Sequence, residues 1–244
     1  MRKPKDTFAR QLIRMSWSKY NLYTIATRGR QAPRLGNRTL YQQKWTAKRE
    51  TRAYHGGQIN ERQFLRLFNP KIPTSNTRVA GQEKDQKHPP AVVLTFASIE
   101  RRLDTIVFRA CLATSIWQAR QMVLHGKVSV NGVKTPSPSH QASPGDIISV
   151  IPNAIPLLSE PATESGLTFV RRPFMQPFIF IPDYLEVNFN TCSIVYLRNP
   201  ISRPGKSEIP SPFPPDLHAL AYELYVSRKK KRTSRQQLRP EKFV

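Results

Sequence analysis

Residues 96–151 carry two helical patterns followed by two strand patterns, and only a few small folds accommodate that order. At the start of the segment, apolar residues recur at the spacing of one amphipathic helix: Ile99, Leu103, Ile106, Val107 and Ala110. After a short break, Ser115 and Gln118 have the spacing of a capping box, which predicts a second helix. Its expected buried face consists of Ile116, Ala119, Met122 and Val123. Gly126 follows, where helices commonly end in the left-handed conformation.

Two turns divide the rest of this segment. Residues 127–130 alternate between polar and apolar side chains, as a half-buried strand does. Asn131 and Gly132 tolerate positive φ and favour a tight hairpin. A Pro-Gly-Asp turn at 144–146 then precedes an apolar strand over residues 147–151. The sequence therefore predicts an α+β module in which two short helices pack against a small twisted sheet.

The charge of the chain indicates its class of partner. Lysine and arginine together number 39 and aspartate and glutamate 16, which gives a formal net charge of +23. Because self-repulsion of that size opposes compaction, its simplest explanation is a polyanionic partner. No run of about 18 apolar residues occurs, so no membrane span is expected. The basic segments also lack the wide apolar face of an interfacial helix, which favours nucleic acid over an anionic membrane.

Charge and proline content predict six regions. Most of the positive charge lies in the first and last of them and in the helical region. In order, they are a basic extended arm (1–38), a helical region with a linker (39–95), the RNA-binding module (96–151), a proline-rich insertion (152–182), strands with a closing helix (183–227) and a basic tail (228–244). The Arg-rich, acid-poor beginning suits an RNA-binding arm and a mitochondrial targeting sequence equally, and both interpretations stay open.

Two helices are expected in the helical region, over residues 39–54 and 60–68. The first carries Lys44, Lys48 and Arg52 on one face at four-residue spacing. Three apolar residues are available for its packing: Leu40, Tyr41 and Trp45. In the second, Asn60 and Gln63 form a plausible capping pair.

The segment after the insertion has the pattern of a hairpin followed by a helix. Residues 185–189 alternate between apolar and polar side chains, and residues 194–197 are the expected partner strand. Asp216 is the expected cap of the closing helix. Its apolar face consists of Leu217, Leu220, Ala221 and Leu224. The basic residues 228–232 at its end suit both the helix dipole and phosphate groups.

With the apolar faces of the two central helices turned inward, the other side chains of the module are expected on its surface. Arg102 and Arg109 are two helical turns apart, which places them on one side. The candidate RNA-binding residues of the module are Arg101, Arg102, Arg109, Arg120, Gln121, His125, Lys127 and Lys134. Those of the N-terminal region are Arg28, Arg30, Arg34, Arg38, Lys44, Lys48 and Arg52. Pairing of Arg102 with Asp104 or Asp146, and a capping role for His125, are the alternatives.

No catalytic residue, metal or cofactor is expected. Cys111 and Cys192 lie far apart, each without a second thiol nearby, which argues against a disulfide framework and a four-cysteine zinc site. The simplest interpretation is two small, semi-buried side chains in a reducing compartment.

Short motifs run through the module in a fixed order: Arg102-Leu103-Asp104, Phe108-Arg109, residues 118–121, residues 125–132 and residues 144–148. This order resembles the RNA-binding module in the family of the fourth protein of the small ribosomal subunit. Residues 184–187 and 223–225 are similar to the C-terminal part of that family. Residues 47–68 are similar to the variety found in mitochondria.

The resemblance implies a module of the αL type in a structural protein of the mitochondrial ribosome, in the matrix, which supports subunit assembly and translation. Its implied partners are the five-way junction in the 5′ domain of the small-subunit rRNA, near the mRNA entrance, and neighbouring small-subunit proteins. The RNA-facing positions of the family correspond to Arg102, Arg109, Arg120, Gln121, His125 and Lys127. Many bacterial members bind a metal through an N-terminal cysteine cluster that this sequence lacks, so no zinc is expected. The insertion has no counterpart in the compact bacterial form.

Similar modules occur in some pseudouridine synthases, tyrosyl-tRNA synthetases and heat-shock proteins. A free RNA chaperone of the heat-shock type and an RNA-modifying enzyme are therefore alternatives. The enzyme would need a separate catalytic domain, whereas the downstream carboxylates have no accompanying catalytic pattern: Asp183, Glu186, Asp216 and Glu223. A synthetase would need a phosphate-binding loop, and none is evident in the sequence.

Overall fold

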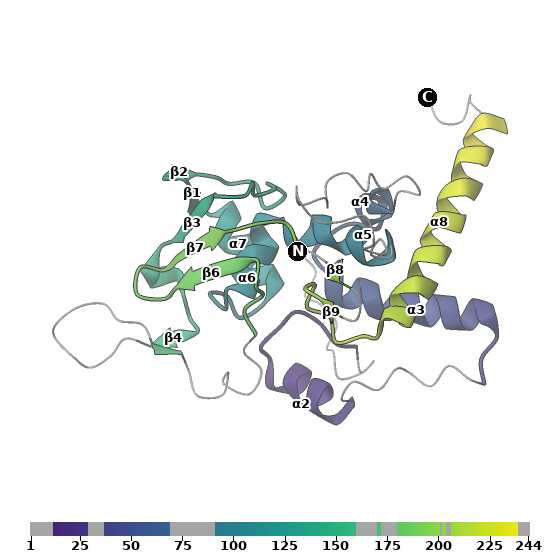
Figure 1. Ribbon diagram of the computed structural model, residues 1–244, viewed down its shortest axis with the longest axis horizontal. Coiled ribbons are helices and arrows are strands. Elements are labelled where there is room, and N and C mark those ends of the chain that lie inside the picture. Colours follow the sequence, from purple (N-terminus) through teal and green to yellow (C-terminus); the bar gives the residue numbers. More distant parts are fainter. Residues whose placement is uncertain are drawn as a thin grey trace.

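The computed structural model describes residues 12–28, 37–68, 91–159, 170–171, 180–200, 202–203 and 206–238. These form a sheet-containing part and a helical part that lie side by side (Figure 1). No helix within these ranges is both long enough and apolar enough to cross a membrane.

The sheet-containing part is the predicted α+β module. Its five strands are β1 (Val128–Val130), β2 (Val133–Lys134), β3 (Ile147–Val150), β6 (Leu185–Asn188) and β7 (Ser193–Tyr196). They form an antiparallel sheet in the order β2-β1-β3-β7-β6. The register pairs Val130 with Ile148 and Ile148 with Ile194, so that these buried side chains share one face. The C-terminal hairpin therefore extends the sheet of the module instead of forming a separate unit.

The expected turns are confirmed. Asn131 and Gly132 connect β1 to β2 with φ angles of 50° and 82°, a conformation that most side chains disfavour. Gly126 ends the preceding helix at φ 67°, and Gly145 lies in the turn before β3 at φ 93°. Each of these residues was identified from the sequence because the local backbone requires it.

The helices α6 (Leu103–Arg109) and α7 (Ile116–Leu124) pack against the inner face of the sheet. Ser115 caps α7 as expected, since its hydroxyl accepts a hydrogen bond from the Gln118 N–H. Gln118 instead accepts from the backbone N–H of Thr114, so the reciprocal half of the predicted capping box does not form.

The single helix expected over residues 99–110 is wrong. The chain forms α5 (Ala91–Glu100) and α6, with an extended residue, Arg102, between them. Arg102 forms an antiparallel bridge with Gln141, and the Leu103 N–H donates to the carbonyl of His140. This pairing with a distant loop interrupts a hydrophobic pattern that appears continuous in the sequence.

The helical part consists of α3 (Leu40–His55), α4 (Glu61–Leu67), α5 and α8 (Pro215–Leu238). Thr39 and Gln42 form a capping box at the start of α3, whereas Asn60 makes no side-chain cap on α4, so the predicted Asn60–Gln63 pair is wrong. Four buried rings from α4, its C-cap, α5 and α8 form the core of this part: Phe64, Phe68, Phe96 and Tyr225. Helix α8 continues through the basic residues 228–232 instead of ending there.

The extended arm expected at the N-terminus is wrong for residues 12–28. Residues Lys19–Arg28 form helix α2, and the side chains of Leu12, Ile13 and Met15 are buried. Met15 belongs to the core of the module, and its carbonyl accepts a hydrogen bond from the Ile116 N–H. Residues 1–11 and 29–36, including Arg30 and Arg34, lie outside the described residues.

Parts of the proline-rich insertion contribute to the core. Ile155 and Leu158 are buried in the hydrophobic cluster of the module. The described elements here are a 3-10 turn η2 (Pro152–Ala154), β4 (Leu158–Ser159) and β5 (Val170–Arg171), and the two strands pair with each other. The short strands β8 (Ser202–Arg203) and β9 (Lys206–Ser207) form a second small ribbon.

The capping hydroxyl of Ser115 provides a test of this local structure. We expect Ser115→Ala to lower the free energy of unfolding by about 1 kcal/mol, because an N–H at the start of α7 loses its acceptor. Urea denaturation of the full chain measures this change. Ser139→Ala is the control, since that exposed hydroxyl pairs with another exposed hydroxyl, Ser137. Equal unfolding midpoints for the two variants would contradict the capping assignment.

Candidate RNA interface

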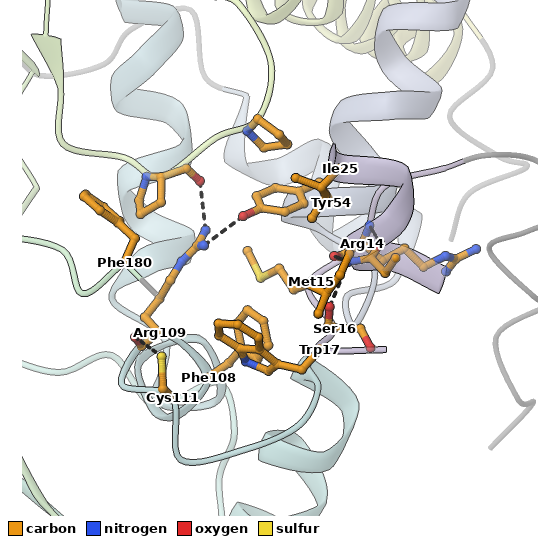
Figure 2. Close-up of a pocket in the computed structure, with 14 residues that line it drawn as sticks. Arg14, Met15, Ser16, Trp17, Ile25, Tyr54, Phe108, Arg109, Cys111 and Phe180 are labelled. Carbon is orange, nitrogen blue, oxygen red and sulfur yellow. Dashed lines mark hydrogen bonds between the residues drawn. The ribbon is translucent and has the colours of Figure 1, made fainter. Parts of the chain in front are cut away.

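A buried ion pair lies where the module meets the helical part. The Arg109 guanidinium donates two hydrogen bonds of 2.9 Å to the two carboxylate oxygens of Glu100. It also donates to the hydroxyl of Tyr54 at 2.9 Å and to the carbonyl of Pro210 at 3.0 Å (Figure 2). Tyr184 donates to Oε2 of the same carboxylate at 2.9 Å. Three further segments of the chain, around Tyr54, Tyr184 and Pro210, therefore converge on the pair that α5 and α6 form.

The expectation that Arg109 faces outward is wrong. Its side chain is only 6% exposed, and every residue of α6 is buried. The helical period separated an apolar face of α6 from a polar one, but α3, α5 and the segment around Pro210 cover the polar face. The signal that could have revealed this is Glu100, a carboxylate inside an apolar stripe, which needs a buried partner.

The electrostatics of the pair favour its ionised form. Burial alone would raise the pKa of the Glu100 carboxyl, but the charge of Arg109, the neighbouring His55 ring and the hydrogen bonds of Arg109 outweigh it and hold that pKa at about 2. Burial opposes the charge of Arg109 too, yet Glu100 raises its pKa well above the usual value. Burial, followed by the nearby Glu100 charge, raises the pKa of the Tyr184 hydroxyl, which stays protonated as a donor.

Two buried histidines lie beside this pair. His55 is fully buried, and its ring lies 5.5 Å from that of His218, centroid to centroid. The hydroxyl of Ser211 lies within hydrogen-bonding distance of the Nε2 atoms of both. Burial and then the neighbouring His55 lower the pKa of His218 to about 3, and burial also lowers the pKa of His55. Both rings are therefore neutral at neutral pH, and they pack against each other around the Ser211 hydroxyl.

Arg102 and Arg120 lie around a second buried carboxylate. Arg102 donates to both oxygens of Asp104, at 3.1 and 2.9 Å, which is one of the pairings left open by the sequence. Arg120 lies 4.0 Å from the same carboxylate and donates to the carbonyl of Gln58 at 3.3 Å. Because Arg102 precedes α6 in an extended conformation, it does not share a helix face with Arg109, contrary to the expectation.

Exposed polar side chains continue from these two arginines along the end of α7 into the hairpin. Gln121, His125, Lys127 and Lys134 are all exposed. The Gln121 amide and the His125 ring lie 3.4 Å apart, while the backbone of His125 provides the C-cap of α7. Arg101 is half-buried and donates to the carbonyl of Ala142. The structure thus places most of the module residues expected to bind RNA, as exposed or partly exposed side chains, on elements that share one core. We call Arg102, Arg120, Gln121, His125, Lys127 and Lys134 the module surface.

The basic face expected on α3 contacts other helices. Lys44 pairs with Glu223 of α8 at 2.8 Å, and both Lys48 and Arg52 pair with Glu61 of α4. Their charges are therefore partly compensated within the protein. Arg38, just before α3, is exposed and donates to the hydroxyl of Thr46. The side chain of Arg28 is not among those described.

Among the described residues, no group of three or more His, Cys, Asp or Glu side chains has the geometry of a metal site. Cys111 and Cys192 are buried, free thiols. A pocket of about 190 Å³ lies beside Arg109, between the N-terminal segment, α2 and Phe180 (Figure 2).

Residues 101–148 match the model of the S4 domain family. The chain is 41% identical to the small ribosomal subunit protein uS4m of Schizosaccharomyces pombe, over 89% of this chain and 78% of that protein. It is 31% identical to the small ribosomal subunit protein uS4 of Rickettsia prowazekii, over 73% of each chain. A uS4 protein of Chelativorans is also 31% identical, over 68% of this chain and 70% of its own length. These matches confirm the resemblance inferred from the motifs.

The buried pair makes a specific prediction about stability. We expect Arg109→Met to lower the free energy of unfolding by about 3–5 kcal/mol at pH 7, because Glu100 would remain buried without its partner. Since the pKa of Glu100 is depressed, the stabilisation is complete above about pH 4.5 and is lost as the pH falls towards about 2.

Urea denaturation across this pH range measures the effect. Arg120→Met serves as the control, because it removes a partly exposed arginine from the same module. Comparable losses of stability in the two variants at pH 7 would show that the buried pair has no special role.

Proposed function

Because the chain belongs to the uS4 family of small ribosomal subunit proteins, we propose that it is a structural, non-catalytic component of the mitochondrial small ribosomal subunit that binds rRNA through its S4 domain. The observation that supports this most directly is the module surface. It presents cationic and hydrogen-bonding side chains on a scaffold whose helices and strands share one core. Such a surface can position folded RNA through phosphate and ribose groups.

In this proposal the candidate RNA-binding residues have different roles. Arg102, Arg120, Gln121, His125, Lys127 and Lys134 contact rRNA, together with Arg101 at the edge and Arg28, Arg30, Arg34 and Arg38 of the N-terminal region. Lys44, Lys48 and Arg52 chiefly hold α3 against α4 and α8, because glutamates already face them. Arg109 is structural and sets the position of α6.

The finer points of the proposal follow the family resemblance. The rRNA partner would be the 5′ domain at its five-way junction, near the mRNA entrance, with neighbouring small-subunit proteins around it. Binding there would support assembly of the subunit and, through it, translation. In the same proposal the 152–182 insertion contacts either a neighbouring protein or an rRNA feature specific to the organelle.

Sedimentation tests the ribosomal assignment. We expect an epitope-tagged copy of the chain to follow the small subunit in a gradient of mitochondrial lysate, in stoichiometric amount and also at high salt. A free RNA chaperone would appear mainly at the top of the gradient or associate only under stress. That second pattern would exclude the proposed function.

The module surface predicts a change in salt dependence. We expect Arg120→Ala combined with Lys127→Ala to weaken rRNA binding and to lower the slope of log affinity against log salt by about two, since two phosphate contacts are lost. Filter binding over a salt series gives that slope. Lys44→Ala is the matched control, because Glu223 already pairs with this lysine. An unchanged slope in the double variant would argue against the module surface.

A further inference from the structure

The apolar residues of α3 expected to pack inside the protein point outward instead. Leu40 is 60% exposed, Tyr41 63% and Trp45 43%, whereas the face of α3 turned inward carries Thr46, Ala47, Glu50, Thr51 and His55. An exposed apolar patch of this kind commonly marks an interaction site. The inward face of α3 packs on α8 through the small side chain of Ala47, which clusters with Leu217 and Ala221, and the larger apolar residues are left on the opposite face.

The two rings form an ordered platform. Tyr41 and Trp45, one turn apart on α3, are stacked with a centroid distance of 6.3 Å and an interplanar angle of 25°. Cations lie over the indole: the Lys48 Nζ is 5.0 Å from its centroid and the guanidinium carbon of Arg228, on α8, is 4.9 Å from it. These contacts fix the ring of Trp45. Tyr41, at the outer edge, has the larger exposed surface.

A groove of about 430 Å³ lies along this platform, lined by Arg38, Tyr41, Gln42, Trp45 and Thr46. None of these five residues is acidic. The Arg38 guanidinium is held in the groove by its 2.9 Å hydrogen bond to the Thr46 hydroxyl. The groove therefore combines aromatic faces, an amide and a guanidinium, which are the groups that bind a base, a base edge and a phosphate.

Helix α8 extends the positive charge beyond the platform. It crosses α3, and its C-terminal half projects away from the body of the protein (Figure 1). The sequence of that half holds Arg228, Lys229, Lys230, Lys231, Arg232 and Arg235 and no acidic residue before the helix ends at Leu238. Arg228 joins the two features, because it lies both on this helix and over Trp45.

We infer that the crossing of α3 and α8 forms a second RNA-binding surface, in which unpaired nucleotides stack on Tyr41 and Trp45 while the projecting helix follows the phosphates. The inference rests on the proposed function in rRNA binding and extends it to single-stranded segments, outside the module surface. Charge decides between RNA and a protein partner. A protein docking on these aromatics would have to supply acidic groups for Arg38, Arg228 and the basic helix, whereas RNA supplies them along its whole backbone.

Binding of single-stranded RNA by the full-length protein tests the inference. The probes are a labelled oligouridylate of about 12 nucleotides and a labelled hairpin with the same number of phosphates, measured by fluorescence anisotropy over a salt series. We expect Tyr41→Ala combined with Trp45→Ala to reduce affinity for the oligouridylate at least tenfold, with little change in the salt slope. Affinity for the hairpin should change less than threefold.

Three further variants make the result specific. Tyr41→Phe with Trp45→Phe should keep most of the affinity, because stacking needs the ring. Truncation after Ser227 should flatten the salt slope, because the basic helix is lost. Tyr23→Ala, which removes an exposed ring on α2, should have no effect.

Near-normal affinity of the double alanine variant for the oligouridylate would overturn the inference, as would equal losses on both probes. The inference is also overturned if that variant binds RNA normally but fails to enter the small subunit, since the patch would then contact a protein. Arg120→Ala with Lys127→Ala, measured on the same probes, keeps the proposals distinct. Loss of hairpin binding there supports the module surface whatever the platform does.

Discussion

The ion pair between Glu100 and Arg109 is the contact on which the arrangement of the two parts depends. It lies in the interior. Arg109 also donates to the Tyr54 hydroxyl and to the carbonyl of Pro210, and Glu100 also accepts from the Tyr184 hydroxyl. A buried pair of this kind adds little stability compared with apolar packing, but leaving either partner alone is costly. It therefore disfavours any arrangement of α3, α5, α6 and the C-terminal segment that separates these groups.

This constraint explains how the protein uses its positive charge. A net charge of +23 repels itself, and the fold compensates part of it with the few carboxylates available. Glu61 and Glu223 hold the basic face of α3 against its neighbours, and Asp104 lies beneath Arg102 and Arg120. The compensated cations are thereby fixed in place, and those left towards solvent are presented on rigid elements. Preorganised cations of this kind suit a folded RNA, because little side-chain freedom is lost on binding.

Local sequence patterns predict some features of this structure correctly and others wrongly. Positions fixed by local backbone requirements were predicted correctly: the Asn131–Gly132 hairpin, the left-handed Gly126 and the Ser115 cap. Two local predictions fail, the Asn60–Gln63 cap and the reciprocal half of the box at Ser115. The larger failures involve contacts between distant segments. Arg102 leaves the expected helix because it pairs with Gln141. Residues 12–28 were expected to be extended because of their composition, yet they add Met15 to the core of the module.

The sequence by itself determined the local elements, the α+β class of the module, the polyanionic partner and, through its motifs, the family. It could do so because turns, caps and strand alternation depend on neighbouring residues, and net charge on composition alone. Only the tertiary structure decided which side chains face outward. Periodicity divides a helix into two faces but does not specify what packs on either one. Arg109 was therefore predicted at the surface and lies buried on a glutamate, whereas Tyr41 and Trp45 were predicted to pack inside and lie exposed.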